Sequence, residues 1–255
     1  MDFRNKVVLV TGASRGIGAA IAQAFAREGA LVVINYLRND EAAARVAEHC
    51  TGSGGDAWPV RADVMDAAAV DDMVERVLME TGRIDVVVNN ALRAYRFNPD
   101  LRRRFQELDW SAYREQFDGA VQSARNVCAA VVPHMRRRAG GNIVNIASDL
   151  GEHPVVPYHD YATAKAALVG FSRHLAADLG PSGIRVNCVA PGLVWPTDAS
   201  RETRESLREQ LAGQTPLRRI ATPDDVTGPV MFLASDWSRF MTGQVLYVDG
   251  GLVMR

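Results

Sequence analysis

The sequence predicts a single α/β domain, in which helices cover both faces of a doubly wound sheet of seven mainly parallel strands. Short runs rich in β-branched residues alternate with longer stretches of helical periodicity, and this alternation is typical of βαβ units. The short runs are mostly apolar at every position, as expected for strands that helices cover on both faces. No repeat, low-complexity tract or linker divides the 255 residues, so we expect one domain from residue 1 to residue 255.

The expected strands are short, and each ends at a turn or a loop. In chain order they span residues 6–10, 31–35, 57–61, 84–89, 142–146, 184–189 and 244–248. The helices between them are indicated by apolar residues at helical spacing and by Gly or Pro near their ends. They span residues 16–28, 41–49, 67–80, 113–138, 161–179 and 224–234.

Two connections are longer than this architecture needs. Residues 91–110 are polar and rich in Arg, and residues 191–216 carry Pro, Gly, Thr and charged side chains. Long loops inside a compact domain are uncommon and often functional. Both follow predicted strands, so both should lie at the carboxyl edge of the sheet, where doubly wound folds bind ligands. We expect residues 191–216 to form a lid over the substrate.

Composition excludes several classes of protein. The formal net charge of −1 gives no general attraction to nucleic acid or to an anionic membrane, and no stretch is apolar enough to span a bilayer. The arginines at 93, 96, 102, 103 and 104 stand among acidic residues, which favours a solvated loop beside the substrate over a nucleic-acid surface. Five scattered histidines lack metal-ligand spacing, so we expect no metal. Three separate cysteines and the lack of a basic, apolar leader indicate a cytoplasmic protein.

A glycine-rich turn stands between the first strand and the first helix, and it reads Thr11-Gly12-Ala13-Ser14-Arg15-Gly16-Ile17-Gly18. Glycines allow the backbone to turn tightly and to approach a pyrophosphate, and the helix N-terminus offers free N–H groups and a positive dipole. This context predicts a Rossmann-like dinucleotide site.

The end of the second strand should select the dinucleotide. An acidic side chain there would accept hydrogen bonds from the ribose diol and repel a 2′-phosphate. The segment instead reads Asn35-Tyr36-Leu37-Arg38, without a carboxylate at the strand end. Arg15 and Arg38 could both meet the phosphate with a planar fork of donors, so we expect NADP(H).

Tyr161 and Lys165 stand four residues apart on a predicted helix and therefore project from one face. An ammonium close to a phenol favours the phenolate, so we expect Lys165 to lower the pKa of Tyr161 and to make it an acid-base catalyst. Ser148 follows a strand end and could hydrogen-bond the substrate oxygen. We take Ser148, Tyr161 and Lys165 as the catalytic residues.

The spacing of the glycine turn resembles that of the short-chain dehydrogenase/reductase family. From about Lys6 to Gly251, further motifs follow in the family's order: Asp63-Val64, Asn89-Asn90-Ala91, Ser148, Tyr161 with Lys165, Pro191-Gly192 and Val248-Asp249-Gly250-Gly251. The resemblance implies that Asp63 and Val64 hold the adenine, and that Asn90 and Lys165 hold the ribose on the nicotinamide side. The turn, the strand end and the resemblance together predict these cofactor-binding residues: Gly12, Ser14, Arg15, Gly16, Ile17, Gly18, Asn35, Tyr36, Arg38, Asp63, Val64, Asn90, Ala91, Tyr161, Lys165, Pro191, Gly192 and Val194.

Two positions depart from the family's pattern. Leu92 replaces a glycine that often follows Asn-Asn-Ala, and Ala120 stands where an asparagine often helps to hold a proton-relay water. A water or a backbone carbonyl could substitute for that asparagine.

The chain is similar to the branch labelled 3-oxoacyl-[acyl-carrier-protein] reductase, which implies reduction of a 3-oxoacyl thioester carried on acyl-carrier protein or CoA. Two alternatives stay open: a carbonyl reductase or secondary-alcohol dehydrogenase for another small or apolar substrate, and a nucleotide-sensing protein without turnover. The family usually forms tetramers, so we expect a homotetramer in which residues 243–255 contact a neighbour.

Overall fold

The computed structural model describes residues 1–254, so the last residue of the predicted domain and of the predicted interface segment lies outside the described residues. Its centre is one sheet of seven strands in the order β3-β2-β1-β4-β5-β6-β7. All the strand pairs are parallel. The strands are β1 (Val7–Val10), β2 (Leu31–Tyr36), β3 (Asp56–Arg61), β4 (Val86–Asn89), β5 (Gly141–Ile146), β6 (Ile184–Pro191) and β7 (Val245–Val248). The prediction of seven strands between helices is confirmed, and the sheet is wholly parallel.

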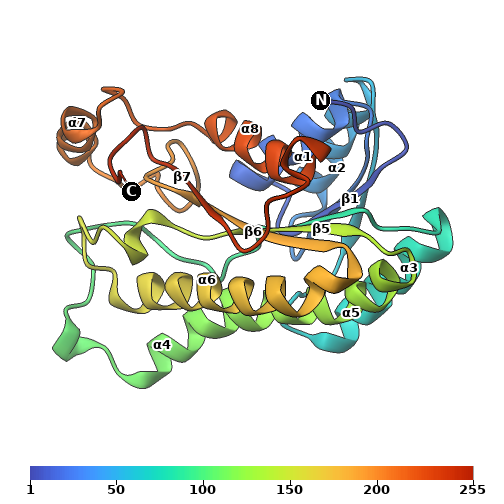
Figure 1. Cartoon of the computed structure of the whole chain (residues 1–255). Coiled ribbons are helices and arrows are strands. Elements are labelled where there is room, and N and C mark those ends of the chain that lie inside the picture. Colours follow the sequence, from blue (N-terminus) through green and yellow to red (C-terminus); the bar gives the residue numbers. More distant parts are fainter. Residues whose placement is uncertain (255) are drawn as a thin grey trace.

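Two layers of helices enclose the sheet (Figure 1). One layer holds α1 (Gly16–Arg27), α2 (Asp40–Thr51) and α8 (Pro223–Ala234), and the other holds α3 (Ala67–Thr81), α5 (Ser123–Arg137) and α6 (His159–Leu179). Two further helices, α4 (Trp110–Phe117) and α7 (Glu205–Gln214), lie near the carboxyl edge of the sheet. The short 3-10 turns span Phe105–Glu107, Asp149–Gly151, Gly180–Ser182 and Asp236–Ser238.

The core divides between the two faces of the sheet, because successive side chains of a strand point to opposite faces. Val8 and Val10 pack with α1, α2 and α8, whereas Val7 and Leu9 pack with α3, α5 and α6. Helices cover both faces, and this is why most positions of the strands are apolar.

The predicted helix 113–138 is wrong as a single α-helix. It begins at Trp110, and the π-helical turn η2 (Asp118–Gln122) separates α4 from α5. Gly119 in this turn lies directly under the loop after β4, since a Cβ there would be 2.4 Å from Arg93 Cβ. An apolar pattern does not reveal one extra residue in a helical turn.

The predicted loop 191–216 contains an α-helix that the sequence analysis missed. Only Leu207 and Leu211 are buried in α7, one turn apart, and this narrow apolar stripe is too weak a periodic signal among polar residues.

Two further expectations from the sequence concern the cysteines and membrane-spanning helices. The three cysteines are unpaired and buried, as expected. Among residues 1–254, no helix has both the length and the apolar character needed to cross a membrane.

Candidate active site

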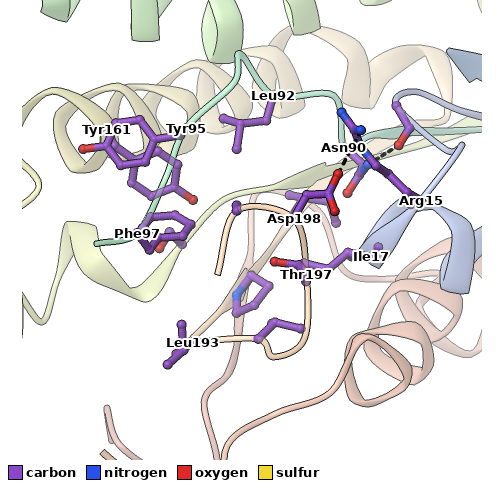
Figure 2. A pocket seen from close by; sticks show the side chains of 18 of the residues that line it. Arg15, Ile17, Asn90, Leu92, Tyr95, Phe97, Tyr161, Leu193, Thr197 and Asp198 are labelled. Atoms are coloured by element: carbon purple, nitrogen blue, oxygen red, sulfur yellow. Dashed lines mark hydrogen bonds and ion pairs between the residues drawn. The ribbon is translucent and has the colours of Figure 1, made fainter. Parts of the chain in front are cut away.

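A pocket of about 1640 Å³ opens at the carboxyl edge of the sheet, next to the point between β1 and β4 where the strand order reverses. Doubly wound folds bind their ligands at this place. Every predicted catalytic and cofactor-binding residue lines this pocket. Part of it is drawn in Figure 2, with Arg15, Ile17 and Asn90 at one end and Tyr161 at the other.

The glycine turn between β1 and α1 fits a dinucleotide phosphate. Gly12 has φ +62°, and a Cβ there would lie 2.9 Å from the Cα of Ala91, so a side chain would close the cradle. Helix α1 begins at Gly16 without a side-chain cap and without an acidic residue in its first turn. Its first N–H groups and its dipole are therefore suited to an anion.

Two predicted cofactor residues hold the turn in place. Asn90 Nδ2 donates to the carbonyl oxygens of Thr11 (2.9 Å) and Gly12 (3.2 Å). Asn35 is 1% exposed; its Oδ1 accepts from Gly12 N at 3.3 Å and its Nδ2 donates to Ala62 O at 3.1 Å. Both amides bind protein backbone, so they order the turn as well as line the pocket.

The end of the pocket beside β2 carries side chains of opposite charge. Arg38 is exposed at the end of β2, and Asp40, which the sequence analysis did not weigh, also lines the pocket there. Arg15 Nη1 makes an ion pair with Asp198 Oδ2 at 2.9 Å (Figure 2). Asp198 belongs to the loop after β6, so this pair links the glycine turn to the predicted lid.

The three predicted catalytic residues come from neighbouring elements. Ser148 follows β5, while Tyr161 and Lys165 lie one turn apart on α6, both buried. Lys165 Nζ donates to the carbonyl of Ile146 at 2.6 Å and lies 5.8 Å from the centre of the Tyr161 ring. A carbonyl at the end of β5 thus holds the ammonium beside the phenol.

The expected lowering of the Tyr161 pKa is wrong for this structure. Burial raises the pKa of the Tyr161 phenol well above its ordinary range; a hydrogen bond with Ser148 opposes this rise and the nearby Asp149 adds to it. Burial also lowers the pKa of the Lys165 ammonium to about 8. Desolvation penalises both charged forms and outweighs the attraction that the sequence spacing suggests.

Comparison with known proteins decides the family. A family model described as enoyl-(acyl carrier protein) reductase matches residues 12–253. The 3-oxoacyl-[acyl-carrier-protein] reductase FabG of Chlamydia muridarum (strain MoPn / Nigg) is 39% identical over 249 residues, covering 97% of this chain and 97% of that protein. The chain belongs to the short-chain dehydrogenase/reductase family.

Solved structures agree with this membership. A 3-oxoacyl-[acyl-carrier protein] reductase from Brucella melitensis with bound NAD has a TM-score of 0.87 at 36% identity, covering 99% of this chain and 92% of that one. An NAD⁺-bound xylitol dehydrogenase has a TM-score of 0.88 at 30% identity, covering 98% and 100%. As a short-chain dehydrogenase/reductase, the chain is an oxidoreductase of CH–OH and C=O groups with a nicotinamide dinucleotide cofactor.

Of the two departures from the short-chain dehydrogenase/reductase pattern, Leu92 lines the pocket and Ala120 does not. Leu92 projects into the pocket (Figure 2). Ala120 is buried in the π-helical turn between α4 and α5, which packs against α6. The turn is thus present without the family's asparagine side chain.

Some pocket residues of this family member were not predicted as site residues. Tyr95 and Phe97, in the loop after β4, contact the ring of Tyr161 with 5.0 Å between ring centres in each case. The sequence analysis treated this loop only as a polar segment near the substrate. The alternation of Tyr95, Arg96 and Phe97 was an available signal, since side chains of an extended segment alternate in direction.

Asp149 is a second site residue that the sequence analysis missed. It is 4% exposed, lines the pocket, and accepts a long hydrogen bond from Ser148 Oγ at 3.4 Å. Burial and the neighbouring Asp249 carboxylate raise the pKa of Asp149 to about 7. A Cβ on Gly192 would lie 3.2 Å from Asp149 Oδ2 and 3.1 Å from Asp249 Cβ, so both acidic residues flank the Pro191-Gly192 turn.

Within residues 1–254, no group of three or more His, Cys, Asp or Glu side chains is arranged to hold a metal ion.

Proposed function

We propose that the chain is an NADPH-dependent reductase that converts the ketone of a 3-oxoacyl thioester into a secondary alcohol. The observation that carries this proposal is the convergence of Ser148, Tyr161 and Lys165 in one pocket with the glycine turn. Two similar proteins, from Chlamydia muridarum and Brucella melitensis, are 3-oxoacyl-[acyl-carrier-protein] reductases by name, which supports the choice of substrate.

The residues of the chain supply a proton and orientation. The bound reduced nicotinamide supplies the hydride for the carbonyl carbon. Ser148 donates a hydrogen bond to the carbonyl oxygen, which stabilises the negative charge that develops there. Tyr161 then transfers its phenolic proton to this oxygen, and the Lys165 ammonium stabilises the phenolate that remains.

The electrostatics of the site favour the direction of reduction. A phenol at its ordinary pKa of 10.0 is already protonated at neutral pH and burial raises the pKa of Tyr161 further, so Tyr161 starts the reaction with its proton in place. Oxidation of an alcohol needs the phenolate first, so we expect it to require a higher pH.

The preference for NADPH is a separate part of the proposal. It rests on Arg38 at the end of β2 and on the lack of a carboxylate within β2 or directly after it. Asp40 and the Arg15–Asp198 ion pair act against a phosphate there, and both of the similar structures described above contain NAD. Comparable kcat/KM values for NADH and NADPH on one substrate would contradict this preference.

One panel of assays tests the function. NADPH oxidation is measured with acetoacetyl thioesters and with simple ketones, for the natural chain and for Tyr161→Phe. We expect thioester-selective turnover, and a loss of turnover in Tyr161→Phe with NADPH binding retained. Turnover of simple ketones alone would favour a general carbonyl reductase, binding without turnover would favour a nucleotide sensor, and near-normal turnover of Tyr161→Phe would remove Tyr161 from the mechanism.

The proposal extends to partners and location. An acyl-carrier protein or CoA would carry the thioester, and a homotetramer would bury the segment after β7. Buried, unpaired cysteines suit a reducing compartment such as the cytoplasm. The mass of the protein in solution, measured by light scattering, tests the tetramer.

A further inference from the structure

Four aromatic rings, including that of the proposed proton donor Tyr161, form one cluster. Tyr95 and Phe97 contact each other, and each contacts both Tyr158 and Tyr161, with 5.0 to 5.8 Å between ring centres. Tyr95 is tilted by 32° to the Tyr161 ring, and Phe97 meets that ring edge-on at 84°. These are favourable aromatic geometries. Figure 2 shows both loop residues beside Tyr161.

The position of Tyr95 is determined by a hydrogen bond next to the catalytic residue. Tyr95 Oη donates to Asp160 Oδ1 at 2.9 Å, and the same oxygen accepts from the backbone N of Tyr161 at 2.9 Å. Asp160 is 6% exposed and lies in the first turn of α6. The hydroxyl of Tyr95 is thus bound to the residue that precedes Tyr161, and its ring cannot leave the site without breaking a buried hydrogen bond.

Phe97 is held from the opposite side by the loop after β6. Its backbone N donates to Ala199 O at 2.8 Å, and Thr203 Oγ1 donates to its carbonyl at 3.1 Å. The intervening Arg96 points outward and pairs with Glu202 at 2.8 Å. The two long loops therefore hold Tyr95 and Phe97 toward the pocket as one unit.

The rings of Tyr95 and Phe97 limit which substituent a ketone can carry when its carbonyl oxygen reaches Tyr161. The carbonyl oxygen must reach the phenol, so the substituent on the carbonyl carbon comes close to the two rings. Further lining side chains are the apolar Leu92, Val156 and Leu193. Flat unsaturated groups can add to an aromatic cluster edge-on or in offset stacks, whereas puckered groups of the same volume fit it less well.

We propose that Tyr95 and Phe97 are specificity-determining residues, which select 3-oxoacyl thioesters with a flat, aromatic or conjugated group on the ketone carbon. This inference rests on the proposed thioester reductase function and narrows its substrate class. Tyr95 contributes its ring, and Asp160 positions that ring.

Two thioesters of matched size test the inference: 3-oxo-3-phenylpropanoyl and 3-cyclohexyl-3-oxopropanoyl N-acetylcysteamine. We expect the natural chain to favour the phenyl compound in kcat/KM by roughly 10-fold, the ratio that corresponds to about 1.4 kcal/mol of aromatic contact. Tyr95→Leu and Phe97→Leu should each lower this ratio toward one, mainly by lowering kcat/KM for the phenyl compound. Tyr95→Phe keeps the ring but loses the hydrogen bond to Asp160, so its ratio should lie between that of the natural chain and that of Tyr95→Leu.

The matched control is Phe105→Leu in the same loop, because Phe105 is 65% exposed and its ring contacts only His159 among the ring pairs described in residues 1–254. It should leave the ratio unchanged. NADPH binding, followed by fluorescence, shows that each variant is folded. Two results would overturn the specificity proposal and leave the proposed function intact. One is equal kcat/KM of the natural chain for the two thioesters, and the other is a preference for the phenyl compound that survives Tyr95→Leu and Phe97→Leu. No reduction of any thioester would instead overturn the proposed function and the inference that rests on it.

Discussion

The buried carboxyl group of Asp149 makes a quantitative prediction about stability. Asp249, Ser148, Tyr161 and Tyr247 surround it, and burial with the Asp249 charge raises its pKa from 3.8 to about 7. The folded protein therefore retains a proton that the unfolded chain loses near pH 4. The stability contributed by this proton is complete below pH 3.8 and is lost progressively up to about pH 7.

The substitution Asp149→Asn removes this titration without changing the size of the side chain. A pKa of 3.8 in the unfolded chain and of about 7 in the folded protein changes the free energy of unfolding by about 4 kcal/mol in total. About 3 kcal/mol of this change occurs between pH 5 and pH 8. We therefore expect the advantage of Asp149→Asn over the natural chain in unfolding free energy to grow by about 3 kcal/mol over this interval. In melting temperature this is a growth of roughly 6 to 12 °C for a domain of this size.

Calorimetric melting of both proteins at pH 5, 6, 7 and 8 measures this difference. Asp72→Asn, on the exposed face of α3, is the matched control and should show a constant offset. A difference for Asp149→Asn that stays flat from pH 5 to pH 8, or that shrinks, would refute the assignment of a neutral Asp149.

Three further predictions concern the dinucleotide. Arg38→Ala should lower kcat/KM for NADPH about tenfold and leave NADH nearly unchanged, because a charged hydrogen bond to phosphate contributes about 1.5 kcal/mol or more; equal losses in initial-rate assays with the two dinucleotides would contradict a phosphate contact. Gly18→Ala should abolish dinucleotide binding in a fluorescence titration, because a Cβ there would lie 2.5 Å from Asn90 Nδ2; retained affinity would show that the turn can adapt. Asp198→Asn should raise NADPH affinity several-fold by calorimetry, since it frees Arg15 for phosphate; an unchanged Kd would mean that Arg15 does not contact the cofactor.

The predictions that the structure confirmed depend on the spacing of residues within short segments of the chain. The seven strands follow from apolar runs that two helix layers cover. In the glycine turn, Gly12 and Gly16 have positive φ angles, and this local requirement of the backbone is visible in the residue type itself. These features depend on neighbours along the chain, so the sequence alone could determine them.

Contacts between distant segments decided the rest. Arg15 meets Asp198, Tyr95 meets Asp160, and Asp149 lies close to the carboxylate of Asp249. Each pair joins residues far apart in the chain, and no periodic pattern encodes the distance between them. The pKa of Tyr161 also depends on packing between distant segments. Helical spacing places the Lys165 ammonium nearby, but only the folded structure shows that burial of both groups affects the pKa of Tyr161 more than this ammonium does.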